Sequence, residues 1–227
     1  MPKHLQVEIE KLKKRLLLLS AHVEDSLRMA VESIDERDAN LAQQVIDGDS
    51  TIDRSEIEVE EECLKILALH QPVAVDLRFI VGVIKMNNDL ERIGDLAVNI
   101  AERSAFLARE EPVNVPFDFA GMAEKTQWML RRVLDALMKS DTAIAREVCL
   151  ADDQVDAINR EMYDRVKEGI RRHPEHLNSF IHLLCISRHV ERIADLATNI
   201  AQDVIYMVEG DIVRHWAEDY TRQRGRG

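Results

Sequence analysis

The sequence predicts an all-α protein made of two tandem antiparallel three-helix bundles related by internal duplication. Three observations lead to this prediction: the composition, a motif repeated 100 positions apart, and prolines placed between long amphipathic segments. Hydrophobic residues make up 46% of the 227 residues and aromatic residues only 4%, with 8 glycines and 5 prolines. The tight turns of β proteins need more glycine and proline than this. Aliphatic-rich helices packed against one another fit this composition.

The internal repeat is the clearest feature of the chain. The segment ERIGDLAVNIAE at 91–102 recurs as ERIADLATNIAQ at 191–202, with nine of the twelve positions identical. A looser upstream copy at a spacing of 103 pairs Asp38, Ala42, Val45, Asp49 and Asp53 with Asp141, Ala145, Val148, Asp152 and Asp156. Two copies in the same order indicate duplication of a whole folding unit.

Each copy is expected to form three helices. In the first copy we expect helices at about 3–36, 39–69 and 74–109, with Pro72 ending the second. In the second copy we expect helices at about 118–139, 142–172 and 176–208, with Pro174 as the break and Gly210 as the final stop. Short connections between long helices make neighbours antiparallel. A proline-containing linker at 110–116 then separates a first unit, 1–111, from a second, 117–210, followed by a tail at 211–227.

Charge and cysteine content narrow the functional classes. The net charge of −12 repels phosphate backbones, so no nucleic-acid partner is expected. Cys63, Cys149 and Cys185 are widely spaced and form no CxxC pair, so neither disulfides nor a zinc site is indicated. The apolar run at 16–19 is too short for a signal peptide or a membrane span. The sequence therefore predicts a cytoplasmic protein without direct membrane insertion.

Oxygen-bearing side chains form stripes along four of the expected helices. On a helical wheel of about 100° per residue, Glu91, Asp95 and Asn99 share a face opposite the aliphatic residues of the same helix. The sixth helix repeats this stripe with Glu191, Asp195 and Asn199. The second helix carries Asp49, Asp53, Glu56 and Glu60, and the fifth carries Asp152, Asp156, Asn159 and Tyr163.

A solvated acidic face is the simplest interpretation of one such stripe, because like charges at i,i+4 cost only about 0.2–0.5 kcal/mol per pair. The repetition of the stripes in the same order, and the absence of interspersed lysines, favour a cation site instead. Carboxylates gathered from neighbouring helices need a cation, and all-oxygen ligation suits Mg²⁺, Mn²⁺, Ca²⁺ or Fe³⁺ rather than zinc.

Because the stripes oppose the aliphatic faces, the metal is expected on the outside of the bundle. A ferritin-like di-iron site is excluded, since it needs Glu-x-x-His and none of the 8 histidines has a glutamate three residues before it. The sequence also contains no glycine-rich phosphate loop, no Ser-His-Asp arrangement and no reactive cysteine context. These absences predict a protein that is not an enzyme.

The segments QPVAVDLR at 71–78, NDLERIGD at 88–95 and SRHVERIAD at 187–195 closely resemble the PhoU family of phosphate-transport regulators. The resemblance implies a pair of three-helix bundles whose acidic motifs hold metal ions, such as Mg, Mn or Fe, in multinuclear clusters on the surface. The implied metal ligands are Asp49, Asp53, Glu91 and Asp95 in the first copy and Asp152, Asp156, Glu191 and Asp195 in the second. Gln202, where the first copy has Glu102, leaves the second site with one charge fewer.

The resemblance also implies a cytoplasmic homodimer that represses the phosphate-starvation response. In this role it couples a phosphate ABC transporter, through the ATPase component, to a sensor histidine kinase. Two alternatives stay open on the sequence alone. A metal-dependent phosphate-ester hydrolase would use clustered cations as two-metal enzymes do, and a purely structural helical scaffold would bind no metal.

Overall fold

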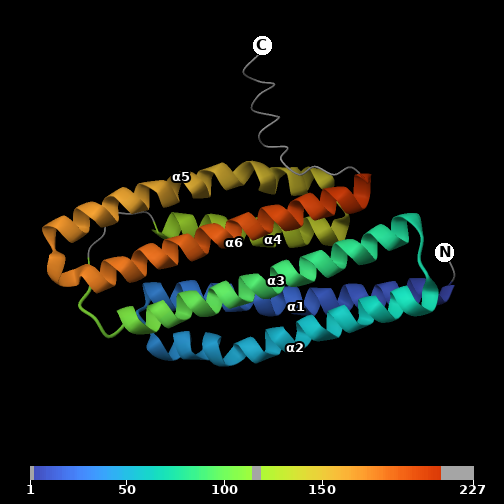
Figure 1. The fold of residues 1–227 in the computed structure, drawn as a ribbon, viewed down its shortest axis with the longest axis horizontal. Helices are drawn as coiled ribbons and strands as arrows, with labels where there is room; N and C mark the ends of the chain where they lie inside the picture. Colours follow the sequence, from blue (N-terminus) through green and yellow to red (C-terminus); the bar gives the residue numbers. More distant parts are fainter. Residues whose placement is uncertain (1–2, 114–118, 211–227) are drawn as a thin grey trace, which may run out of the picture.

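The computed structural model describes residues 3–113 and 119–210, which form six long α-helices and one short 3-10 helix (Figure 1). The elements are α1 (Lys3–Asp35), α2 (Ala39–His70), α3 (Ala74–Leu107), α4 (Phe119–Lys139), α5 (Thr142–Arg172), η1 (Pro174–His176) and α6 (Leu177–Glu209). The predicted all-α duplication is confirmed, with one local difference: the turn at Pro174 is helical before α6 begins. The predicted tail at 211–227 and the linker residues 114–118 lie outside the described residues.

The duplication is visible in how the second helix of each copy begins. Asp38 is the N-cap of α2, and its Oδ1 accepts from the main-chain N–H groups of Asn40 at 2.8 Å and Leu41 at 3.2 Å. Asp141 caps α5 through the same two bonds, at 2.9 and 3.2 Å. Each cap satisfies N–H groups that have no partner within the helix. The same local chemistry therefore fixes the α1–α2 and α4–α5 turns.

The helices pack in two layers (Figure 1). One layer contains α2, α3, α6 and α5 side by side in that order. Behind it, α1 packs on α2 and α3, and α4 packs on α5 and α6. The two halves join where α3 packs along α6, and we call this contact the seam. Lys85 of α3 meets Asp203 of α6 and Arg103 of α3 meets His189 of α6, so the two helices run antiparallel.

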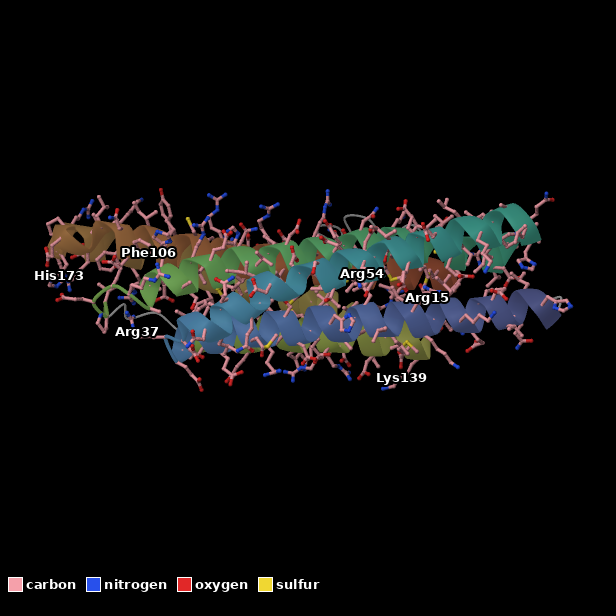
Figure 2. All side chains as sticks on the ribbon, turned by 90° about the horizontal axis from the view of Figure 1, so that it is seen from below. Arg15, Arg37, Arg54, Phe106, Lys139 and His173 are labelled. Atoms are coloured by element: carbon pink, nitrogen blue, oxygen red, sulfur yellow. The ribbon has the colours of Figure 1, made fainter. Side chains whose placement is uncertain are left out.

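Long polar side chains tie helix ends and edges together. Viewed on edge, Arg15 of α1 reaches across to Glu58 of α2, with an Nη1–Oε2 distance of 2.7 Å (Figure 2). Arg37, in the α1–α2 turn, donates from Nη2 to the carbonyl oxygens of Leu107 and Glu110 at the end of α3. These two bonds tie the α1–α2 turn to the C-terminal end of α3.

The aliphatic faces of the helices meet between the two layers and form the core. Leu12, Leu19, Ile93 and Ile100 are among its fully buried residues, and each contributes about 1.5–3 kcal/mol through burial. On the α2 side, a Cβ at Gly94 would lie 3.1 Å from the side chain of the facing Ile52. The missing side chain lets α2 approach α3 closely and thereby brings the two acidic stripes of the first half together. Within the described residues, no helix is both long and apolar enough to cross a membrane.

Candidate functional site

The predicted metal ligands lie on the solvent side of the four-helix layer. Asp53 and Asp95 are exposed and Asp49 and Glu91 are partly buried, whereas Ile93 of the same helix is fully buried in the core. The helical wheel therefore separated the two faces of α3 correctly. The position of the stripes agrees with a site on the outside of the bundle.

In the first half, α2 and α3 bring the predicted carboxylates within electrostatic reach of one another. Partial burial raises the pKa of Asp49, and the charges of Asp53 and Asp95 raise it further. Partial burial also raises the pKa of Glu91, and the charges of Asp95, Glu56 and Asp53 add to this effect. Mutual repulsion between carboxylates is the arrangement that a bound cation relieves.

Glu56 adds a further carboxylate beside these four. The amide of Asn87, which is only 1% exposed, donates from Nδ2 to the Glu56 carbonyl oxygen at 3.0 Å and to Oε1 at 2.9 Å. This pair fixes the side chain of Glu56 against α3. The sequence placed Glu56 in the stripe of the second helix, although the family resemblance did not assign Glu56 as a metal ligand.

The second half repeats the cluster on α5 and α6. The pKa of Asp152 is raised to about 7, mainly by partial burial, and the charges of Asp195 and Asp156 contribute to the increase. Burial raises the pKa of Asp195, and Asp156 raises it further, while Arg192 opposes the shift. Burial likewise raises the pKa of Glu191. The structure therefore brings together the predicted carboxylates of this half as well.

Among the predicted metal ligands, one carboxylate oxygen in each half is buried and has no hydrogen-bond partner: Oδ1 of Asp49 and Oδ1 of Asp152. These residues are equivalent in the repeat. A buried carboxylate oxygen without a partner is unfavourable, and a hard cation is one group that would satisfy it. As the side chains stand, no three His, Cys, Asp or Glu residues of the described chain converge closely enough to hold a metal. The donor chemistry fits such an ion, but the side chains must turn toward one another to share it.

The seam is hollowed on the same solvent side, and we call this hollow the seam groove. A cavity of about 750 Å³ lies between Lys85 and Asp89 of α3 and Asp203 and Tyr206 of α6. It continues past Arg92 into a second hollow of about 480 Å³. This second hollow is lined by Arg92, Asp95, Leu96, Asn99, Arg192, Asp195, Leu196 and Asn199. The acidic stripes of both halves therefore border one groove.

Asp89 and Asp203 are groove residues that the sequence reasoning missed. Asp203 Oδ1 accepts from Lys85 Nζ at 3.0 Å. Burial raises the pKa of Asp89 to about 6, with a further contribution from Asp203 and opposing ones from Arg92 and Lys85. Neither aspartate belongs to a repeated motif, so only the packing of α3 on α6 shows that they meet.

Comparison with known proteins identifies the family to which this chain belongs. Residues 16–104 and 119–204 each match the PhoU domain. The chain belongs to the PhoU family. It is 36% identical over 208 residues to the phosphate-specific transport system accessory protein PhoU homolog of Aquifex aeolicus, an alignment that covers 92% of this chain and 94% of that protein. Over 209 residues it is 35% identical to the PhoU homolog of Pseudomonas aeruginosa, covering 92% of this chain and 86% of the relative.

Solved PhoU structures share the fold. The crystal structure of PhoU from Pseudomonas aeruginosa superposes with a TM-score of 0.87 at 33% identity, covering 91% of this chain and 99% of that one. The phosphate transport system regulatory protein PhoU from Streptococcus pneumoniae superposes with a TM-score of 0.82 at 26% identity, covering 92% and 99%. The two PhoU-domain matches coincide with the two three-helix copies and confirm the resemblance seen in the sequence.

Proposed function

We propose that this PhoU-family protein is a cytoplasmic, non-enzymatic adaptor that negatively regulates the response to phosphate starvation. In this role it couples the ATPase component of a phosphate ABC transporter to a sensor histidine kinase, and it acts as a homodimer. The names of its relatives support this proposal, since they are accessory proteins of the phosphate-specific transport system. The Streptococcus pneumoniae neighbour is named a phosphate transport system regulatory protein.

The proposal includes oxygen-ligated metal ions such as Mg, Mn or Fe on the paired acidic stripes of each half. The observation that carries it is the pair of partnerless oxygens on Asp49 and Asp152, at equivalent positions of the two halves. The residues that would hold the ions are Asp49, Asp53, Glu91 and Asp95 on α2 and α3, and Asp152, Asp156, Glu191 and Asp195 on α5 and α6. A bound cation would supply positive charge that offsets the repulsion between these carboxylates, and it would cross-link the two stripe-bearing helices of each half.

Elemental analysis of the purified chain tests the metal sites. After dialysis against trace Fe, Mn and Mg, we expect bound metal in the native protein and a clear decrease in Asp49→Asn/Asp152→Asn. The matched control is Asp25→Asn/Asp135→Asn, which removes two exposed charges from the other layer. Equal metal content in all three proteins, or none in the native protein, contradicts the metal sites.

The regulatory role is tested in a strain that lacks its own PhoU protein. The native chain should restore repression of a phosphate-starvation reporter, and Glu91→Ala/Asp95→Ala should leave the reporter active at high phosphate. Co-purification with the transporter ATPase and with the histidine kinase identifies which contact is lost. Full repression by the double variant counts against a role of the stripe in signalling.

A further inference from the structure

The seam has approximate twofold symmetry because α3 and α6 are repeats of each other and run antiparallel. A residue near one end of the groove therefore has its repeat equivalent near the other end. Asp89 corresponds to His189, and Asp203 corresponds to Arg103. Each of these pairs changes its charge between the two halves. The two ends of the seam consequently share one shape but not one electrostatic character.

The end beside Lys85 is acidic. The side chains of Asp89 and Asp203 are 14% and 16% exposed, so they border the groove without being free in water. Lys85 engages Asp203 at 3.0 Å, but the nearest basic atom recorded for Asp89 is Nη1 of Arg92 at 3.9 Å. The two carboxylates thus share the cavity with one closely paired cation, and the lining retains acceptors for positive groups.

The end beside Arg103 is basic. Arg103 Nε donates to Nε2 of His189 at 3.3 Å, and Arg188 and Arg192 lie near enough to contribute to the lowered pKa of that histidine. At position 188 the chain has an arginine where its equivalent, position 88, has an asparagine. Arg103 and His189 line neither of the two hollows, but they meet on the seam just beyond the second one. The seam therefore changes from acidic to basic along its length.

We propose that the seam groove docks one helical segment of a partner protein, with Lys or Arg residues toward Asp89 and Asp203 and Asp or Glu residues toward Arg103 and Arg188. This inference rests on the proposed adaptor function and names the surface and the chemistry of the partner. From Val81 to Asn99 the groove follows about 27 Å of α3 at about 1.5 Å per residue, the length of roughly five helical turns. A symmetric groove would accept a helix in either direction, and the charge gradient selects one.

The partner chemistry follows from charge complementarity. Asp89 and Asp203 in the acidic half repel phosphate backbones, which disfavours nucleic acid as the occupant. A uniformly basic helix would be repelled at the Arg103 end, and a uniformly acidic one at the Asp89 end. A helix with separated charges meets an opposite charge at both ends.

The test uses synthetic helical peptides as probes and the full chain as the receptor. One alanine-based peptide of about 18 residues carries lysines in its first two turns and glutamates in its last two. The control peptide has the same composition with the charges interspersed. We expect the fluorescence anisotropy of the labelled segregated peptide to show at least about fivefold tighter binding than that of the control peptide, since several rim charges of about 0.2–1 kcal/mol each act together. In NMR spectra of the full chain, a nitroxide at the lysine end of the segregated peptide should broaden the amide signal of Lys85 rather than that of Arg103.

Receptor variants locate the binding. Asp89→Asn/Asp203→Asn should weaken the segregated peptide by about three- to tenfold, the effect expected for two partly exposed charges. Asp25→Asn/Asp135→Asn, which changes the charge equally in the other layer, should leave its affinity within about twofold. Circular dichroism and thermal unfolding confirm that each receptor is folded.

Three results overturn the inference: equal affinity for the two peptides, equal weakening by both receptor variants, or broadening at the Arg103 end. A fourth does so as well. If the peptide binds only after Arg222, Arg224 and Arg226 are changed to Gln in the full chain, the basic tail of the chain itself is the occupant. None of these outcomes bears on the metal content of the stripes or on phosphate repression, so failure here is distinct from failure of the proposed function.

Discussion

Replacing Asp152 with asparagine should stabilise the metal-free protein at alkaline pH. Burial and the charges of Asp195 and Asp156 raise the pKa of Asp152 to about 7, from an ordinary aspartate value of about 4. Because the folded pKa lies above the unfolded one, the folded chain binds the proton more tightly. This contribution to stability is present below about pH 4 and is lost as the pH rises toward about 7. Asparagine mimics the protonated side chain and does not lose it.

The magnitude follows from the pKa shift. A shift of about three units corresponds to about 4 kcal/mol, at 1.36 kcal/mol per unit. Asp152 is only partly buried, so solvent screening and side-chain rotation reduce this to about 2 kcal/mol. In chelator, we expect Asp152→Asn to raise the free energy of unfolding by about 2 kcal/mol at pH 8, and to converge with the native protein near pH 4.

Urea unfolding followed by circular dichroism between pH 4 and pH 8 measures this difference. Asp25→Asn is the matched control, because Asp25 is 66% exposed on α1 and pairs only across one helical turn. Adding Mn²⁺ at pH 8 should stabilise the native protein more than Asp152→Asn, since ligand binding to the folded state adds to its stability. A pH-independent difference between native and variant, or none at pH 8, refutes the reasoning.

Three substitutions and one labelling experiment test the packing and the helix cap. Gly169→Ala should destabilise by about 1–3 kcal/mol in urea unfolding, because a Cβ there lies 2.5 Å from the ring of Phe180; Gly48→Ala, with nothing within 4 Å, should instead stabilise by about 0.5–1 kcal/mol. Asp38→Ala removes the N-cap of α2 and should lower the free energy of unfolding by about 0.5–2 kcal/mol. The Cys63 thiol, whose pKa burial raises to about 12, should react with iodoacetamide at pH 8 only after unfolding. Unchanged stability in any of the three variants, or rapid labelling of Cys63 in the native state, would contradict these accounts.

The helices and the acidic stripes were predictable from the sequence because local rules set them. Pro72 and Pro174 mark the breaks, Asp38 and Asp141 recur at equivalent helix starts, and the period of the aliphatic residues separates a core face from a solvent face. The pairing of the stripes within each half followed because short connections make consecutive helices neighbours.

The seam was not predictable in the same way. It joins α3 to α6 across about 100 positions of sequence. Neither helix carries a second aliphatic stripe that would predict this contact. The contacts there are mixed: an ion pair between Lys85 and Asp203, a hydrogen bond between Arg103 and His189, and small and large side chains fitted together. Periodicity detects one buried face of a helix, whereas α3 contacts α1, α2 and α6. Asp89 and Asp203 in the groove meet through the contact between α3 and α6, which periodicity does not detect.

The fit across the seam has a consequence for the origin of the fold. At one end, a Cβ at Gly82 would lie 2.5 Å from Met207, and at the other end His182, the repeat equivalent of Gly82, stacks on Phe106 with ring centroids 4.0 Å apart. Two copies of the second half joined in this way would force His182 into the space of Met207. Two copies of the first half would place Lys85 opposite Arg103, in place of its aspartate. The duplicated halves have thus diverged into complementary partners, and neither can replace the other.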